Sequence, residues 1–454
     1  MNAQQPQDRE SAIEPFRDPL DELIAAAWRD RAWRLKAKHR SAASPFSPDA
    51  WMQSADIRIR SYGWEDSNSQ KVEMSETIRA AQSETVVAKR DDAGSAQRKL
   101  STVAGSILRK RHLGWHRNYE LKEILGYGGQ GVVFLTECCG ADGFSFPLAM
   151  KVFFPWNYAN PGEYERAMHR VARAASAMAR INQPHLVDVY LFEQRKGVRV
   201  MLMELVDGYD LRRLLVLDML RWLQQRLDKE RWQTLNDVTV TAGPQRARVL
   251  PGPAVTIIRA CLWALAALHR KEIVHGDIKP ANIMLDIHGL PKIIDIGSAF
   301  EYHETPEDLY TLTWQYAAPE IHRGAPCSPQ SDVTSLGYVL IEMLSGRSLF
   351  GNCRTRESML EAKTSLPRRL KEFLPRPVCN SRRLMELCRR MIEPDLRSRF
   401  ASAEEADLEA KIGAHAFLLE LYRGQLGAAW SHDIQLWIEG MRQQPWQGQG
   451  VNGV

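Results

Sequence analysis

The sequence predicts an α+β protein, in which a strand-rich segment precedes a longer helical one. Apolar residues that include Leu121 and Leu135 flank the glycine-rich turn GYGGQG, a pattern typical of two strands joined in a hairpin. A third strand, PLAMKVFF, follows this hairpin. Residues 163–181 and 257–269 then repeat apolar side chains at helical spacing.

The composition is ordinary for a globular protein. Of the 454 residues, 44% are hydrophobic and 25% are charged, and the formal net charge is +5. This mild charge does not argue for a nucleic-acid partner. The seven cysteines are scattered, and the adjacent pair Cys138 and Cys139 lacks metal-ligand spacing, which favours a reducing compartment. No apolar run approaches the roughly 20 residues of a membrane span, and the N-terminus lacks a secretory signal. We therefore expect a cytoplasmic protein without a transmembrane segment.

The chemically richest stretch runs from Ile273 to Gly297. It contains H-x-D-x-K-x-x-N, with Asp277, Lys279 and Asn282, followed by D-x-G at Asp295. Phosphoryl transfer needs a carboxylate that orients the attacking hydroxyl and oxygen ligands that hold Mg²⁺. The stretch resembles the catalytic and metal-binding loops of the eukaryotic-type (Hanks-type) Ser/Thr protein kinase family.

This resemblance implies a two-lobed protein kinase fold, with a small β-rich lobe and a larger helical lobe. It implies a reaction that uses ATP and Mg²⁺. Asp277 would orient the substrate hydroxyl, Lys279 would steady the γ-phosphate, and Asn282 and Asp295 would hold Mg²⁺. Gly276 is a departure, because most members of the family carry Arg at that position.

The glycine-rich turn resembles the nucleotide-binding loop of the same family. Dinucleotide-binding folds use the same G-x-G-x-x-G spacing, but here a strand rather than a helix follows it, which favours the kinase hairpin. Lys151 resembles the strand lysine that binds the α- and β-phosphates. The run from Val200 to Gly208 resembles the hinge between the lobes, where backbone groups would pair with adenine. The residues implied for ATP are Gly126, Gly128, Gly131, Val133, Lys151, Met203, Glu204 and Val206.

Sequence farther along the chain bears on the substrate class, because H-G-D also begins the catalytic loop of small-molecule phosphotransferases with a kinase-like fold. Ala318-Pro319-Glu320 resembles the A-P-E that closes a protein-kinase activation segment. Asp332 resembles the aspartate of the helix that supports the catalytic loop, and Arg399 or Arg397 would pair with Glu320. This set favours a protein substrate, and Lys279 together with Thr313 favours Ser or Thr as the acceptor.

Two features bear on activity and its control. The resemblance places the glutamate that pairs with the strand lysine at position 174, which is Ala174. Glu163 shares that helical face but lies about 16 Å away along the axis, and Glu165 faces the opposite side. Either the helix is shifted in register or the pair is missing, and a missing pair would favour a pseudokinase that acts as a nucleotide-binding or scaffolding module.

Gly276 leads to a hypothesis about regulation. Without an arginine there, a phosphorylated activation loop would lose its main local charge partner. The loop already carries acidic residues, Glu301, Glu304, Glu307 and Asp308. We therefore expect activity that does not depend on phosphorylation of the activation loop.

The resemblance divides the chain into three parts. We expect the terminal extensions either to pack on the kinase domain, to dock a partner or to regulate it. Packing is favoured for the tail tryptophans Trp430, Trp437 and Trp446. The expected parts are a partly helical, partly disordered or linker extension (1–117), a kinase domain (118–410, with lobes 118–206 and 207–410 and an insertion at about 217–252) and a helical tail (411–454).

Overall fold

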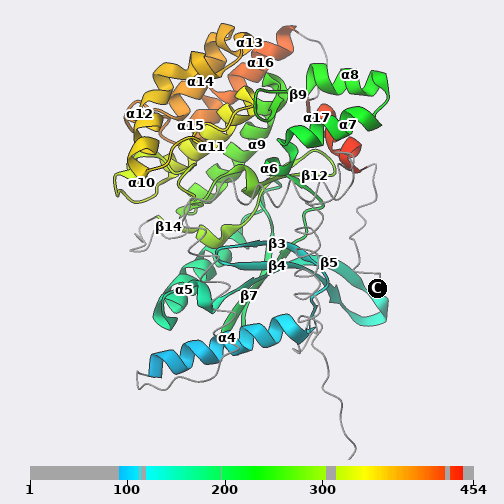
Figure 1. The fold of residues 1–454 in the computed structure, drawn as a ribbon, viewed down its shortest axis with the longest axis vertical. Coiled ribbons are helices and arrows are strands. Elements are labelled where there is room, and N and C mark those ends of the chain that lie inside the picture. The colour runs from blue at the N-terminus through cyan, green and yellow to red at the C-terminus, as the bar shows by residue number, and fades with distance from the viewer. Residues whose placement is uncertain are drawn as a thin grey trace, which may run out of the picture.

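The protein has a small lobe built on a β-sheet and a larger helical lobe, as Figure 1 shows for the computed structural model. The structure describes residues 92–110, 112–113, 119–195, 197–302, 313–424 and 430–442. Most of the N-terminal extension, which we expected to be partly helical, lies outside these residues, as does Trp446. The predicted α+β class and the arrangement in two lobes are confirmed.

The small lobe is organised around a five-stranded antiparallel sheet with the order β3-β4-β5-β7-β6. The predicted glycine-rich hairpin joins β3 to β4, and the strand that carries Lys151 is β5. Both β5 and β7 have paired strands on each side, so their side chains are largely buried. The strands are β3 (Ile124–Gly128), β4 (Gly131–Cys139), β5 (Ser145–Phe153), β6 (Val189–Arg195) and β7 (Val198–Glu204).

Helix α5 (Pro161–Met178) packs against this sheet and against the segment that follows the D-x-G motif. Its N-cap is Asn160, whose side-chain oxygen accepts the Glu163 N–H at 2.9 Å. The helix is amphipathic, and Ala174 lies on its buried face. The predicted helix at 163–181 thus begins two residues earlier and ends three residues earlier in the structure.

Helix α4 (Asp92–Lys110) belongs to the N-terminal extension and was not predicted from the sequence. It lies at the end of the small lobe that faces away from the helical lobe (Figure 1) and packs against η2 (Pro155–Asn157), α5 and β7. The Gln97 side chain donates a hydrogen bond to the Pro155 carbonyl at 2.8 Å. Along the chain, two short paired strands follow α4 and precede the sheet: β1 (His112–Leu113) and β2 (Tyr119–Glu120).

The helical lobe is centred on α9 (Pro251–His269) and α11 (Pro329–Ser345), which pack against each other. Both helices are apolar on most of their surface and are buried almost throughout. Among the described residues, α9 alone is long and apolar enough to cross a membrane, but 78% of its apolar window is buried inside the protein, as in a core helix. The other helices here are α10 (Pro319–His322), α12 (Arg356–Phe373), α13 (Arg376–Asn380), α14 (Arg382–Met391), α15 (Ala403–Leu408) and α16 (Ala414–Gly424).

Short strands and turns position the motif residues between the lobes. Strand β11 (Ile273–Val274) pairs with β14 (Phe300–Glu301), and β12 (Ile283–Asp286) lies between β13 (Pro291–Ile293) and β8 (Gly208–Asp210). Asp277 lies between β11 and β12, and Asp295 follows β13. Antiparallel pairing of these strands brings the two aspartates to the same edge of the helical lobe.

The segment 217–252 forms α7 (Leu217–Arg226), α8 (Lys229–Val238) and a hairpin of β9 (Val240–Ala242) and β10 (Ala247–Val249), after the short α6 (Leu211–Leu214). Within this segment, β10 packs on α11 and α8 packs on α17, and both α8 and α17 are labelled in Figure 1.

The C-terminal part is helical, as expected of the tail, but it consists of separate helices. Helix α15 ends at Leu408, and Gly413 then approaches the chain so closely that a Cβ on it would lie 2.5 Å from the Asp407 carbonyl oxygen. This tight turn separates α15 from α16. Helix α17 (Trp430–Arg442) then packs on α8 and α9, with Trp430 and Trp437 buried, which confirms packing for these two tryptophans.

Candidate active site

Helix α11 holds the loop that carries Asp277. The Asp332 carboxylate lies in the first turn of α11 and is buried. It accepts the His275 N–H at 2.8 Å and the Gly276 N–H at 3.0 Å, and His269 Nε2 lies 2.9 Å away. The Asp332 carboxylate therefore sets the backbone path of residues 275–277. His275 is fully buried and bonds to the backbone, so it acts as a packing residue rather than as a base.

Gly276 has φ = +76°, a backbone conformation that glycine adopts without steric cost. A Cβ at this position would lie 3.1 Å from the Ser298 carbonyl oxygen. Ser298 belongs to η4 (Ile296–Ser298), directly after Asp295. The glycine therefore allows the two motif loops to approach each other closely.

Asp277, Lys279 and Asn282 form one hydrogen-bonded group. Lys279 Nζ donates to Asp277 Oδ2 at 2.6 Å and to Thr313 Oγ1 at 2.9 Å. The Asn282 amide nitrogen donates to the Asp277 carbonyl at 2.8 Å and to Asp277 Oδ2 at 3.2 Å. Asp277 Oδ1 is buried and has no hydrogen-bond partner among the residues that the structure describes. A buried carboxylate oxygen without a donor is costly unless a ligand supplies one, and a substrate hydroxyl is such a donor.

Asp295 of the helical lobe contacts Lys151 of the small lobe. Lys151 Nζ forms an ion pair with Asp295 Oδ1, and the Gly297 N–H donates to the same oxygen at 3.0 Å. Burial by itself would raise the pKa of Asp295. The Lys151 ammonium, the two hydrogen bonds and nearby Lys279 outweigh it and lower the pKa to about 2. Asp295 is therefore an anion at neutral pH, as a metal ligand must be.

The residues present fit a Mg²⁺ ion that is also bound by phosphate oxygens. No cluster of three or more His, Cys, Asp or Glu suited to a metal occurs in the described part of the chain. Asn282 uses its amide nitrogen within the protein, so its amide oxygen is left to coordinate. The hydrogen bonds that the described residues make to Asp295 go to Oδ1, which leaves Oδ2 for a metal. Two hard oxygen ligands with the remainder from water and phosphate are the usual arrangement for Mg²⁺ in phosphotransferases.

The glycine hairpin shows where a ligand would approach the backbone. A Cβ on Gly131 would lie 1.9 Å from the Val152 carbonyl oxygen, so glycine is required there by the neighbouring strand. A Cβ on Gly126 or Gly128 would meet no atom within 4 Å. Protein packing does not require glycine at these two positions, whereas close approach by a phosphate group would. Val133 pairs with Lys151 across β4 and β5, so the hairpin and the lysine face a common space.

The predicted hinge connects β7 to β8. Met203 is buried at the end of β7, and the Glu204 side chain binds Lys292 at 2.8 Å. The Glu204 N–H donates to the Asp188 carbonyl at 2.9 Å. Within the described residues, the main-chain groups of Leu205 and Val206 have no hydrogen-bond partner. The Glu204 N–H is therefore engaged within the protein, whereas the main-chain groups of Leu205 and Val206 are available to a ligand.

The predicted lysine–glutamate pair with helix α5 does not occur in the described structure. Ala174 is fully buried and offers no acceptor. Glu163 caps its own helix by accepting the Ala159 N–H, and Glu165 binds Arg199 of β7 with an Nη1–Oε1 distance of 2.7 Å. Lys151 instead contacts Asp295 and Gln130. The absence of the pair, and not a shift in register, is the alternative that the structure supports.

The segment after Thr313 is held by buried charges. Arg399 pairs with Glu320 through two hydrogen bonds of 2.7 and 3.0 Å, whereas the alternative residue, Arg397, is exposed. Lys363 of α12 is fully buried and donates to the carbonyl oxygens of Trp314, Gln315 and Ala317 at 2.8, 2.9 and 2.5 Å. Burial lowers the pKa of Lys363 well below its usual value.

Sequence reasoning did not identify Gln130 or Lys363, or the ion pair between Arg173 of α5 and Glu301, whose Nε–Oε1 distance is 3.1 Å. Gln130 had a usable signal, because it is the polar side chain inside the glycine-rich turn. Lys363 and Arg173 had none, since each lies among other polar residues of an amphipathic helix.

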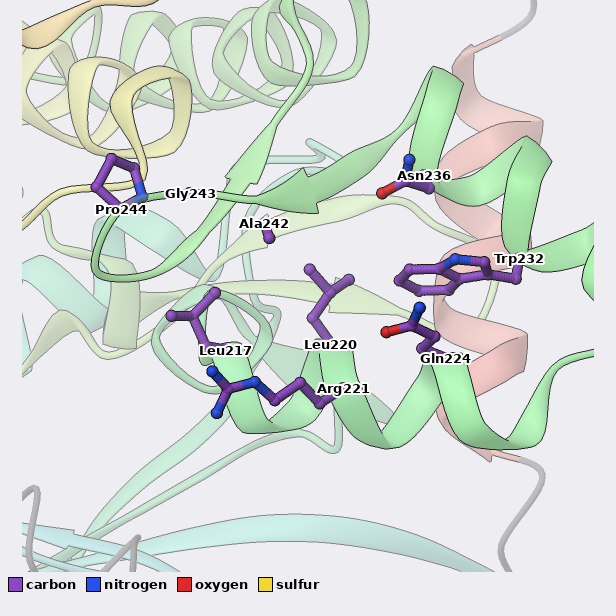
Figure 2. Close-up of a pocket in the computed structure, with 9 residues that line it drawn as sticks. All are labelled: Leu217, Leu220, Arg221, Gln224, Trp232, Asn236, Ala242, Gly243 and Pro244. Carbon is purple, nitrogen blue, oxygen red and sulfur yellow. The ribbon is translucent and has the colours of Figure 1, made fainter.

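A separate pocket of about 250 Å³ lies in the segment 217–252, as Figure 2 shows. The side chains of Leu220, Gln224 and Trp232 face it from α7 and α8. Its one charged lining residue is Arg221, and it contains no carboxylate. The pocket shares no residue with the site around Asp277 and offers no group for acid–base chemistry.

Comparison with known proteins matches the chain to one family. The family model described as "Protein kinase domain" matches residues 119–409. Serine/threonine-protein kinase PrkC of Bacillus subtilis is 27% identical over 299 residues, which cover 64% of this chain and 40% of PrkC. Serine/threonine-protein kinase PknB of Mycolicibacterium smegmatis is 32% identical over 241 residues, 51% of this chain and 33% of PknB. Serine/threonine-protein kinase PkaB of Streptomyces coelicolor is 30% identical over 246 residues, 51% of this chain and 50% of PkaB. The matches thus span half or less of each relative's length.

Proposed function

The chain belongs to the protein kinase family, and on that premise we propose that it is a Ser/Thr protein kinase that transfers the γ-phosphoryl group of ATP to protein hydroxyls. The single observation that carries the proposal is the group around Asp277. Its Oδ1 is buried without a donor, while Oδ2 is held by Lys279 and Asn282. A carboxylate with one oxygen held and the other free is suited to accept a hydrogen bond from a substrate hydroxyl.

The proposed mechanism assigns each group a role. Asp277 Oδ1 accepts the hydrogen bond of the attacking hydroxyl and aims its oxygen at the γ-phosphorus. Lys279 lies between Asp277 and Thr313, where its charge would stabilise the transferred phosphoryl group. Lys151 would bind the α- and β-phosphates. Mg²⁺, held by Asn282 and Asp295, would neutralise the phosphate charge when bound.

The experiment that tests this proposal is transfer of labelled phosphate from ATP to a generic protein acceptor such as casein. We expect Asp277→Asn to lower kcat by about 10²- to 10⁴-fold, the usual range for a lost proton acceptor, and Lys151→Ala and Asp295→Ala to lower it as well. The control is Asp237→Asn on the exposed face of α8, which should behave as wild type. Equal labelling by wild type and all three site variants would exclude the proposed kinase activity of this site.

Two alternatives remain distinguishable in the same assay. A pseudokinase would bind nucleotide without Asp277-dependent turnover. Ala174, which leaves Lys151 without a helix carboxylate, is the observation that favours it. A small-molecule phosphotransferase would label choline or an aminoglycoside and no protein. The buried Glu320–Arg399 pair and the Lys363 contacts favour a protein acceptor, because they order the segment 313–317 that a peptide would contact.

Two finer statements belong to the proposal. We propose that activity does not require phosphorylation of the activation loop, since Gly276 supplies no guanidinium and the Arg173–Glu301 pair already joins α5 to the segment after Asp295. We also propose a cytoplasmic location, because all seven cysteines are free thiols, as in a reducing compartment. Both terminal extensions contribute helices that pack on the lobes, and a regulatory role for them is part of the same proposal.

A further inference from the structure

Lys151 is a nearly buried ammonium group, and such a charge needs acceptors around it. In the described structure helix α5 supplies none, because its carboxylates are engaged elsewhere and Ala174 occupies the expected position. We propose that Gln130, in the turn of the glycine hairpin, takes over the role of the missing helix glutamate and positions Lys151 for the nucleotide phosphates. This inference rests on the proposed function.

The contact geometry supports this role. Gln130 Oε1 accepts a hydrogen bond from Lys151 Nζ at 2.9 Å. An ammonium has three N–H donors, and here one binds Gln130 and one binds Asp295. The third donor remains for a phosphate oxygen. Gln130 and Asp295 together therefore orient the ammonium.

The amide of Gln130 is itself oriented. Its nitrogen donates to Ser298 Oγ at 3.2 Å, which turns its oxygen toward Lys151. The Gln130 carbonyl accepts the Phe154 N–H at 3.1 Å, so the residue is tied to the end of β5 as well. These contacts join the glycine hairpin to η4 through one side chain.

The space that Gln130 occupies depends on a glycine in the neighbouring motif. A Cβ on Gly297 would lie 1.7 Å from Gln130 Oε1 and 2.7 Å from Lys151 Nζ. Any larger residue at 297 would therefore separate the amide from the ammonium. Gly297 permits the Gln130–Lys151 contact by this close approach.

A neutral acceptor has a chemical consequence. A second carboxylate beside Asp295 would add another negative charge next to Lys151, whereas an amide directs the ammonium without adding charge that repels the phosphates. Gln130 is thus a positioning residue that acts through Lys151. Its loss should weaken binding of ligands that carry phosphates and spare ligands that lack them.

The test is a titration of the purified full chain with MgATP and, separately, with adenosine. Gln130→Met keeps the length of the side chain and removes the acceptor. We expect its Kd for ATP to rise about tenfold, as for one lost hydrogen bond to a charged group, while its Kd for adenosine stays within twofold of wild type. The matched control is Gln194→Met on the exposed edge strand β6, which should leave both constants unchanged.

A Kd for ATP within twofold of wild type would overturn the proposal, and so would an equal loss of ATP and adenosine binding, which indicates a structural role for the loop. If Gln130→Met does not fold, Ser298→Ala decides, because it removes only the anchor of the amide. Ser298→Ala should weaken ATP binding two- to fivefold, and unchanged ATP binding would contradict the proposal. The titration measures binding and needs no turnover. If the wild type showed no Asp277-dependent transfer, the proposed function would be refuted, but the titration would still test the role of Gln130.

Discussion

Arg399 and Glu320 form a buried, bidentate ion pair with N–O distances of 2.7 and 3.0 Å. The pair joins the segment 313–320 to the loop after α14. The guanidinium also donates to the carbonyls of Glu393 and Gln330 at 2.8 and 3.3 Å. These contacts satisfy the guanidinium in a place that water does not reach. Removing one partner would leave the other as a buried, unpaired charge.

We therefore expect Arg399→Met to lower the free energy of unfolding by about 3–5 kcal/mol, the usual cost of breaking a buried pair from one side. Urea unfolding followed by fluorescence measures it. The matched control is Arg369→Met, because Arg369 pairs with Glu372 on an exposed helix surface and its loss should cost less than about 1 kcal/mol. Similar losses for the two variants would show that burial is not the cause.

Replacing Lys363 should raise the KM for a peptide acceptor more than the KM for ATP. Lys363→Met leaves the carbonyls of Trp314, Gln315 and Ala317 without their donor, each at a cost of about 1–3 kcal/mol if it stays buried. We expect the KM for a peptide acceptor to rise at least tenfold, with the KM for ATP unchanged, and the thermal midpoint to fall. Lys371→Met, on the exposed side of the same helix, is the control. Equal changes in both KM values would contradict a role specific to this segment.

The environment of His322 should make the folded protein less stable in mild acid. Burial, followed by the nearby charges of Lys363, Arg356 and Arg323, lowers its pKa from 6.5 to about 4. Its Nε2 contacts the Trp314 carbonyl at 3.1 Å, and Nδ1 is buried without an acceptor for an added proton. Below pH 6.5 the unfolded chain therefore binds a proton that the folded chain rejects, so stability falls as the pH drops toward 4.

Between pH 7 and pH 5 this histidine should cost about 1–2 kcal/mol of unfolding free energy. His322→Gln keeps a donor for the Trp314 carbonyl and cannot be protonated, so its stability should depend less on pH by that amount. Urea unfolding at the two pH values measures the difference. Identical pH dependence in wild type and variant would exclude His322 as the source.

Thr305 and Thr311 test the independence from activation-loop phosphorylation; both lie outside the described residues. Because Gly276 offers no charge partner and Glu301 already pairs with Arg173, we expect replacement of both threonines by Ala to leave kcat within a few-fold of wild type. The positive control is Thr313→Val, which removes a Lys279 contact and should lower kcat. A loss above about tenfold (about 1.4 kcal/mol) in a folded double variant would refute the hypothesis.

The local motifs were readable from the sequence because their geometry is set within a few residues. Asp277, Lys279 and Asn282 lie within six consecutive positions, and the backbone between β11 and β12 brings them into contact. The glycine hairpin and the helix with Ala174 follow from turn chemistry and helical periodicity in the same way. The lobes and their order follow from the succession of these segments.

Contacts between distant segments could not be read in this way. Lys151 contacts Gln130, 21 residues earlier, and Asp295, 144 residues later, and Lys363 contacts a backbone segment more than 40 residues away. Helix α4 was missed although its sequence is amphipathic, and its place on the small lobe depends on packing.

The sequence by itself thus determined which groups carry the chemistry around Asp277 and that position 174 lacks a carboxylate. Only the tertiary structure decided that the ammonium of Lys151 is oriented from the glycine hairpin instead. The physical reason is that a buried charge takes its acceptor from whichever segment packs beside it, and packing depends on the whole fold rather than on neighbours in the chain.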